Sequence, residues 1–105
     1  MMLRLPSGVG EKQVNLTEQQ AIQTSRVFLD SRNYTTGNVL SVTLDEMNPT
    51  YYFYWHELFG LAKPDVNNTG LTWVVRFEQA ENLGHWFEVC IDAHSGEVVG
   101  GSQCR

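Results

Sequence analysis

The sequence predicts an α+β fold in which one N-terminal amphipathic helix packs on an antiparallel sheet of about four to five strands. Three observations support this prediction. A capped segment with helical spacing begins near Leu16. Apolar residues then alternate with period two in several later segments, which is typical of half-buried strands. Finally, Gly96 follows such a segment at a point where the chain must reverse.

The helix is predicted from its cap and from its apolar stripe. Thr17 is an N-cap residue, Gln20 completes a capping box three positions later, and Leu16 is placed to pack against the first turn. Apolar and small side chains then recur at helical spacing, with polar side chains on the opposite side. The stripe consists of Ala21, Ile22, Ser25, Phe28 and Leu29. Asn33 and the polar residues 35–38 mark the expected end of the helix.

Two strands are expected after the helix. In residues 39–44, Leu40, Val42 and Leu44 alternate with hydroxyl side chains, so the three apolar residues are expected on one buried face. Residues 51–55, with the sequence YYFYW, are rich in aromatic side chains that favour strands.

Glycine, proline and asparagine break the strand pattern in residues 56–70. This segment is therefore predicted to be a long loop, which leaves room for one helical turn.

An antiparallel hairpin is predicted from residues 71–80 and 85–92. Trp73, Val75 and Phe77 alternate with Val74, Arg76 and Glu78 in the first strand. In the second strand the apolar set is Phe87, Val89 and Ile91. Residues 81–84 are polar and join the two strands.

A tight turn at Asp92 and Gly96 closes the last hairpin. Residues 94–96 fit a three-residue loop that ends on a glycine in the left-handed region, where a side chain would clash. Asp92 can accept hydrogen bonds from N–H groups of the loop. Both residues are therefore interpreted as structural rather than catalytic.

Length and composition predict one globular domain. The chain has 105 residues, of which 42% are hydrophobic, and residues 1–14 form a polar lead-in that is expected to be flexible. The net charge of −5 and the absence of a Lys/Arg cluster argue against a nucleic-acid partner. No segment approaches the roughly 18 consecutive apolar residues of a membrane-spanning helix.

The histidines and cysteines are the candidate residues for metal binding or nucleophilic catalysis. His85, Cys90 and His94 contain metal-ligating atoms, but positions 85 and 90 face opposite sides of a strand and do not converge on an ion. A Cys90–His94 nucleophile pair lacks a third group to orient it. The sequence therefore predicts no catalytic residue, no metal and no cofactor.

The two cysteines leave two alternatives open. If the last strand keeps the register of its loop, Cys104 faces Trp86 and lies about 13 Å along the sheet from Cys90. A disulfide needs Cα atoms roughly 4.4–6.8 Å apart, so a bridge requires the tail after Gly101 to leave the sheet. Free thiols are the other alternative.

Aromatic side chains supply the candidate binding surface. Alternation sends only half of the rings in residues 51–55 to one face, so the others must lie at the surface or meet a partner. The candidates are Tyr52, Tyr54, Trp55 and Phe59. The alternative is that these rings cover the sheet beneath the long loop. A free strand edge able to receive an extended peptide is a further route to binding.

Three segments resemble the PepSY domain family, which also occurs in propeptides of thermolysin-like metallopeptidases. LTEQQAIQTSRVFL is similar to the opening helix of the family and LTWVVRF to its middle strand. HWFEVCIDAHSGEVVG, with Asp92 and Gly96, resembles its closing hairpin. Together they cover about half of the chain. The aromatic and loop segment 47–70 is longer than the minimal unit of the family.

The resemblance implies that residues 15–105 form a single PepSY-like domain of cystatin-like shape. It implies a non-enzymatic module that binds a protein or peptide outside the cytoplasm, as a secreted or extracytoplasmic protein, and that modulates or inhibits a secreted peptidase. The alternative is a structural or self-associating module, a homo-oligomer that uses the aromatic patch within residues 51–59.

Overall fold

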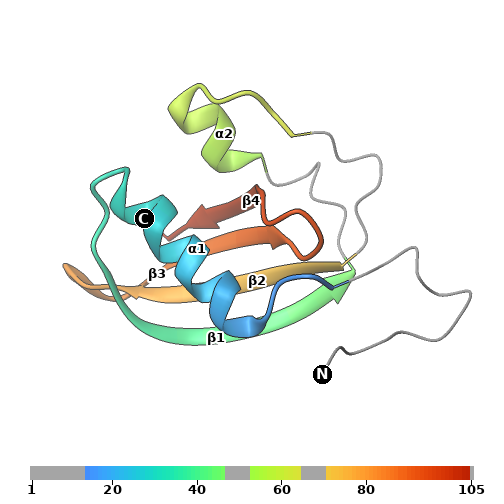
Figure 1. The fold of residues 1–105 in the computed structure, drawn as a ribbon. Helices are drawn as coiled ribbons and strands as arrows, with labels where there is room; N and C mark the ends of the chain where they lie inside the picture. Colours follow the sequence, from blue (N-terminus) through green and yellow to red (C-terminus); the bar gives the residue numbers. More distant parts are fainter. Residues whose placement is uncertain (1–13, 47–52, 65–70, 105) are drawn as a thin grey trace, which may run out of the picture.

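A computed structural model describes residues 14–46, 53–64 and 71–104. In this part of the chain, helices α1 (Glu18–Asp30) and α2 (Tyr54–Phe59) lie on one side of a four-stranded antiparallel sheet, as Figure 1 shows. The strands are β1 (Thr36–Glu46), β2 (Leu71–Gln79), β3 (Asn82–Asp92) and β4 (Val98–Gln103). Their spatial order is their order in the chain, so each strand pairs with its sequence neighbour. The predicted α+β class is confirmed.

Helix α1 begins at the predicted capping box. The main-chain N–H of Gln20 donates to Thr17 Oγ1 at 3.1 Å, and the N–H of Thr17 donates to Gln20 Oε1 at 2.8 Å. Ala21, Ser25 and Leu29 are buried against the sheet, which confirms the apolar stripe. The helix ends at Asp30, and Asn33 then takes a positive φ of 68° that redirects the chain into β1.

Strand β1 departs from the predicted alternation. Its register to β2 shifts on both sides of Val39, so an extra residue, Leu40, lies between Val39 and Ser41. Val39 and Val42 consequently pack against the core, whereas 54% of Leu40 is exposed. The prediction that Leu40 shares a buried face with Val42 and Leu44 is wrong, because the bulge moves it out of phase.

The aromatic segment forms a helix where a strand was predicted. Tyr54–Phe59 is helix α2, so the strand prediction is wrong for residues 53–55; Tyr51 and Tyr52 lie outside the described residues. A helix places side chains four positions apart on one face, and the rings of Trp55 and Phe59 stack with centroids 6.0 Å apart. Gly60, with a φ of 67°, ends the helix in the left-handed region.

Strands β2 and β3 form the predicted hairpin, but their turn is shorter than expected. Gln79 pairs with Asn82, so Ala80 and Glu81 make the turn and residues 82–84 already belong to β3. The predicted buried set is confirmed, since Val75, Phe77, Phe87, Val89 and Ile91 all lie in the core.

The last turn holds four residues, one more than predicted. Asp92 N–H donates to the carbonyl of Glu97 at 2.8 Å, and Gly96 N–H donates to the carbonyl of Asp92 at 2.9 Å. Asp92 Oδ1 also accepts from the N–H groups of His94 and Ser95 at 2.8 and 3.3 Å. Gly96 has the expected positive φ, 83°. The interpretation of Asp92 and Gly96 as turn residues agrees with these contacts.

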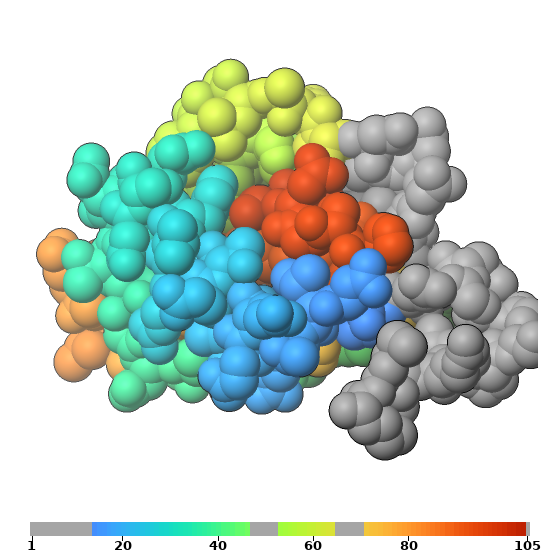
Figure 2. All heavy atoms as spheres, viewed as in Figure 1, coloured from blue at the N-terminus to red at the C-terminus, as the bar shows by residue number. Residues whose placement is uncertain are grey.

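The core lies between the two helices and the sheet. Phe28 of α1 packs edge-on against Trp55 of α2, with ring centroids 5.9 Å apart, which joins the helices into one layer. Figure 2 views the molecule from this side: atoms of α1 lie in front of the sheet, and those of α2 lie above β4, which stays visible. The fully or nearly fully buried members of this cluster are Ala21, Leu29, Trp55, Val75, Phe77, Phe87, Val89 and Ile91.

Candidate functional site

The face of the sheet opposite α1, here called the outer face, carries a row of four polar side chains. Ser41 pairs with Arg76, Arg76 with Glu88, and Glu88 with Ser102, so each of the four strands contributes one member. Paired residues in adjacent antiparallel strands share a face and lie within contact distance. The row therefore runs straight across the sheet.

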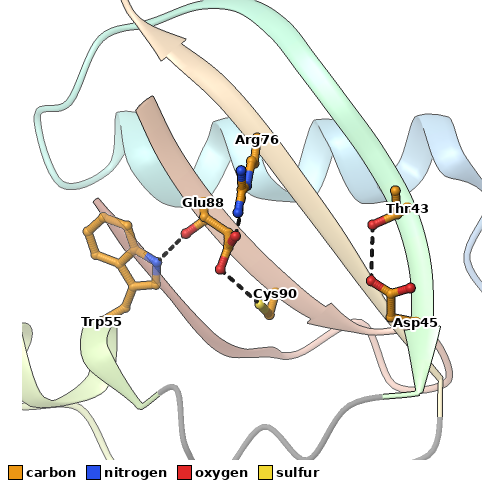
Figure 3. Close-up of polar contacts among 6 residues, drawn as sticks. All are labelled: Thr43, Asp45, Trp55, Arg76, Glu88 and Cys90. Carbon is orange, nitrogen blue, oxygen red and sulfur yellow. Dashed lines mark hydrogen bonds and ion pairs between the residues drawn. The ribbon is translucent and has the colours of Figure 1, made fainter. Parts of the chain in front are cut away.

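Arg76 is the centre of this row. Its Nε donates to Glu88 Oε1 at 2.9 Å, and its guanidinium carbon lies 5.1 Å from the ring centroid of Trp86. The side chain of Arg76 is 48% exposed, whereas that of Glu88 is only 9% exposed. Arg76 is thus held on two sides while about half of its side chain still meets solvent. Figure 3 shows Glu88 between Arg76 and Cys90.

A shallow hollow of about 560 Å³ lies over this row, here called the outer-face hollow. Clefts that bind small molecules have volumes of about 300–1,000 Å³, so the size of the hollow is within that range. Within it, Thr43 Oγ1 donates to Asp45 Oδ2 at 3.2 Å. The lining residues are Ser41, Thr43, Asp45, Val74, Arg76, Trp86, Glu88 and Ser102.

The lining offers hydrogen-bonding groups of both kinds beside an aromatic ring. Hydroxyls donate and accept, the guanidinium only donates, and the carboxylates only accept when ionised. Such a mixture suits a polar main chain or a charged side chain.

Cys90 lies beside this row, but its thiol is not available to act as a nucleophile. The residue is fully buried, and its Sγ lies 4.0 Å from Glu88 Oε2. Burial, followed by the charge of Glu88, raises the pKa of the Cys90 thiol to about 12. The thiol therefore stays protonated at neutral pH, and a thiol rather than a thiolate is a poor nucleophile.

Both cysteines are free thiols, so the disulfide alternative is not realised. The main-chain N–H of Cys104 donates to the carbonyl of Trp86 at 2.9 Å, as the predicted register requires. Cys90 pairs with Gly100 instead, four residues along β4.

The predicted aromatic surface is mostly core. Trp55 has no exposed area, and its Nε1 donates to the carbonyl of Glu88 at 2.9 Å. Tyr54 and Phe59 are half-buried, and the hydroxyl of Tyr54 accepts a 2.8 Å hydrogen bond from Gln103 Nε2. Tyr52 lies outside the described residues. The structure therefore places Trp55 inside the molecule and not on a surface open to a partner.

The three histidines do not meet. His56 of α2 is 6% exposed and its Nδ1 has no hydrogen-bond partner, while His94 Nδ1 lies 3.0 Å from Asn15 Nδ2. Burial lowers the pKa of His56, against smaller opposing effects from Val98 and Glu97. His85 lies on β3. Residues 14–46, 53–64 and 71–104 contain no group of three or more His, Cys, Asp or Glu side chains arranged to hold a metal.

The fold and the site define an α+β domain with helices on one face of its sheet and a polar hollow on the other. No family model, curated protein or solved structure matches the chain in comparisons with known proteins. In the described part of the chain, neither helix is long and apolar enough to span a bilayer.

Sequence reasoning missed Arg76, Trp86 and Glu88 as site residues. The feature of the sequence that could have identified them is their position in the predicted hairpin. All three occupy the alternate positions that face away from the apolar set.

Proposed function

We propose that the chain is a non-enzymatic module that binds a protein or peptide through the outer-face hollow. The observation that carries the proposal is the position of Arg76, which lines the hollow, is held by Glu88 and Trp86, and keeps 48% of its side chain exposed. A fixed guanidinium loses little conformational entropy when it donates to carbonyl or carboxylate oxygens. Arg and Trp are also the residue types most enriched at the centres of protein interfaces.

The similarity of residues 85–100 to the closing hairpin of the PepSY family supports a more specific form of this proposal. In that form the partner is a secreted peptidase, which the module inhibits or modulates, and the protein acts outside the cytoplasm. The module uses no cofactor.

The alternative of a self-associating module receives less support. It needs the rings of residues 51–59 at the surface, and Trp55 is fully buried while Tyr54 and Phe59 pack against the core.

The proposal is tested by selecting binders and then closing the hollow. A phage-displayed library of random peptides is panned on the full chain, and selected peptides are titrated against ¹⁵N-labelled protein by NMR. We expect shifts at Ser41, Thr43 and Arg76. Thr43→Arg places a long side chain in the hollow and should weaken binding at least tenfold.

The matched control is Asn38→Arg, which adds the same charge to the same strand at an exposed position outside the hollow. This variant should bind the selected peptides with an affinity within about twofold of that of the unsubstituted chain. A library that yields no binder, or shifts confined to α1 and α2, would contradict the proposal. The peptidase form is tested separately: the full chain should slow a thermolysin-like metallopeptidase, and Thr43→Arg should abolish that effect.

A further inference from the structure

We infer that the partner is an extended peptide, with basic and aliphatic side chains in alternation, that pairs with the outer edge of β1. The inference rests on the proposed function and names the partner's conformation and chemistry. It follows from the exposed edge of β1, from the length of its regular pairing, and from the side chains on its two faces.

Strand β1 is a terminal strand of the sheet. Within the described residues β2 is its strand partner, and Arg26 of α1 bonds to its first two residues, Thr36 and Gly37. No described strand pairs with residues 41–45 on the side away from β2. Such an edge is a template for another extended chain. The opposite edge strand, β4, is shorter, and α2 packs against it through Trp55. The β1 edge is therefore the more open of the two.

The regular part of β1 sets the length of the template. Both register shifts lie before Ser41, and the pairing then runs without interruption from Ser41 opposite Arg76 to Glu46 opposite Leu71. Bulges disturb the spacing of main-chain groups and protect edges from pairing, so the first half of β1 is a poor template. The template is therefore taken as residues 41–45, which span about 17 Å at ~3.3 Å per residue.

The two faces of this part of β1 favour different side chains in a bound peptide. On the outer face, Thr43 and Asp45 line the hollow, and a residue of an added strand beside them would meet a carboxylate. On the helix side, Leu44 is 37% exposed next to the core residue Val42, so an aliphatic neighbour would cover it. A chain with a net charge of −5 adds a general attraction for a cationic peptide.

Four labelled peptides test the inference by fluorescence anisotropy with the full chain. The first alternates lysine and valine over six residues, and the second replaces every lysine with glutamate. The other two are the lysine peptide with N-methyl groups on all odd or all even amides. In an added strand alternate amides point toward β1, so methylation of one set removes the pairing and methylation of the other does not.

We expect the lysine peptide to bind and the glutamate peptide to bind at least tenfold more weakly. One N-methylated peptide should lose at least tenfold in affinity, and the other should stay within about threefold of the parent. Hydrogen exchange should slow at those amides of residues 41–45 that point away from β2 when the lysine peptide is bound.

Asp45→Asn should weaken the lysine peptide about two- to fivefold, as expected for an exposed ion pair. The matched control, Asp30→Asn, removes the same charge from the exposed end of α1. It should change the affinity for the lysine peptide less than half as much as Asp45→Asn does.

Each outcome separates this inference from the proposed function. If both N-methylated peptides bind like the parent, or the β1 amides stay unprotected, strand pairing is wrong even where Thr43→Arg still abolishes binding. If the lysine peptide does not bind while library peptides do, the partner chemistry is wrong. If neither binds, the proposed function fails as well. Protection of the β1 amides that grows with protein concentration, without peptide, would assign the edge to a second copy of the chain.

Discussion

The indole of Trp55 lies against the bare α-carbon of Gly101. A side chain at position 101 would collide with Trp55 Nε1 and with the carbonyl oxygen of Glu88, the same oxygen to which Trp55 donates its hydrogen bond. The approach of α2 to β4 therefore depends on the absence of one methyl group.

Gly101→Ala should destabilise the fold strongly. The added Cβ needs the occupied space, and a φ of 136° is a conformation that almost only glycine adopts. We expect a loss of about 2–4 kcal/mol in the free energy of unfolding, measured by urea titration of Trp fluorescence. Gly84→Ala is the control, because Gly84 also has a positive φ, 90°, but nothing lies within 4 Å of its Cβ position. It should cost about 1 kcal/mol. Equal losses would contradict the packing argument.

Asp92→Ala should loosen the last turn. The substitution removes the acceptor for the N–H groups of His94 and Ser95, and we expect a loss of about 1 kcal/mol in the free energy of unfolding. Asp92→Asn keeps an oxygen in the same place and should lose less than half as much. If both substitutions cost the same, the charge of Asp92 and not its hydrogen bonds stabilises the turn.

His56 should make the fold less stable in acid. Burial lowers its pKa below the ordinary 6.5, so below pH 6.5 the unfolded chain binds a proton that the folded chain resists. The free energy of unfolding should therefore fall as the pH drops from 6.5 toward the lowered pKa, with no contribution from His56 above 6.5. His56→Gln should flatten this slope, as measured by urea titrations between pH 5 and 7.5. The control is His85→Gln, which removes a partly exposed imidazole and should keep the slope of the wild-type protein. Identical slopes in the two variants would refute the role of His56.

Cys90 should resist alkylation in the native protein. Its thiol is fully buried and has a pKa of about 12, whereas Cys104 is only half-buried. Iodoacetamide at pH 8 should label one thiol per native chain and two in urea, as counted by mass spectrometry. Native Cys104→Ser protein should remain almost unlabelled. Rapid labelling of that variant would show that the environment of Cys90 is open.

The helices, strands and turns that depend only on neighbouring residues in the chain were predictable from the sequence. The capping box of Thr17 and Gln20 requires only four consecutive residues, and the alternation in 85–92 identifies the buried face without knowledge of any partner. The aromatic run was ambiguous, because Phe53, Tyr54 and Trp55 suit a strand while Trp55 and Phe59 are also spaced for one face of a helix. Packing of both rings against Phe28 decided in favour of the helix.

The site was less predictable because it depends on register. Alternation alone shows that Arg76 and Glu88 face away from the core, but not that they meet. A loop confined to residues 81–84 would set Ala80 opposite His85 and hence Arg76 opposite Val89. The shorter turn and the irregularity after Glu78 bring Arg76 opposite Glu88 instead. The bulge around Leu40 likewise depends on the partner strand, which a single segment does not reveal.

Helix α2 precedes β2 in the chain, yet it packs on β4, the last of the four described strands. The indole of Trp55 can meet Phe28 as soon as α2 exists, but its contact with Gly101 requires a segment 46 residues further along the chain. The β2–β3 hairpin needs only a two-residue turn and is free to form earlier. The contact between α2 and β4 therefore joins parts of the chain that are far apart in sequence, whereas the hairpin joins neighbours.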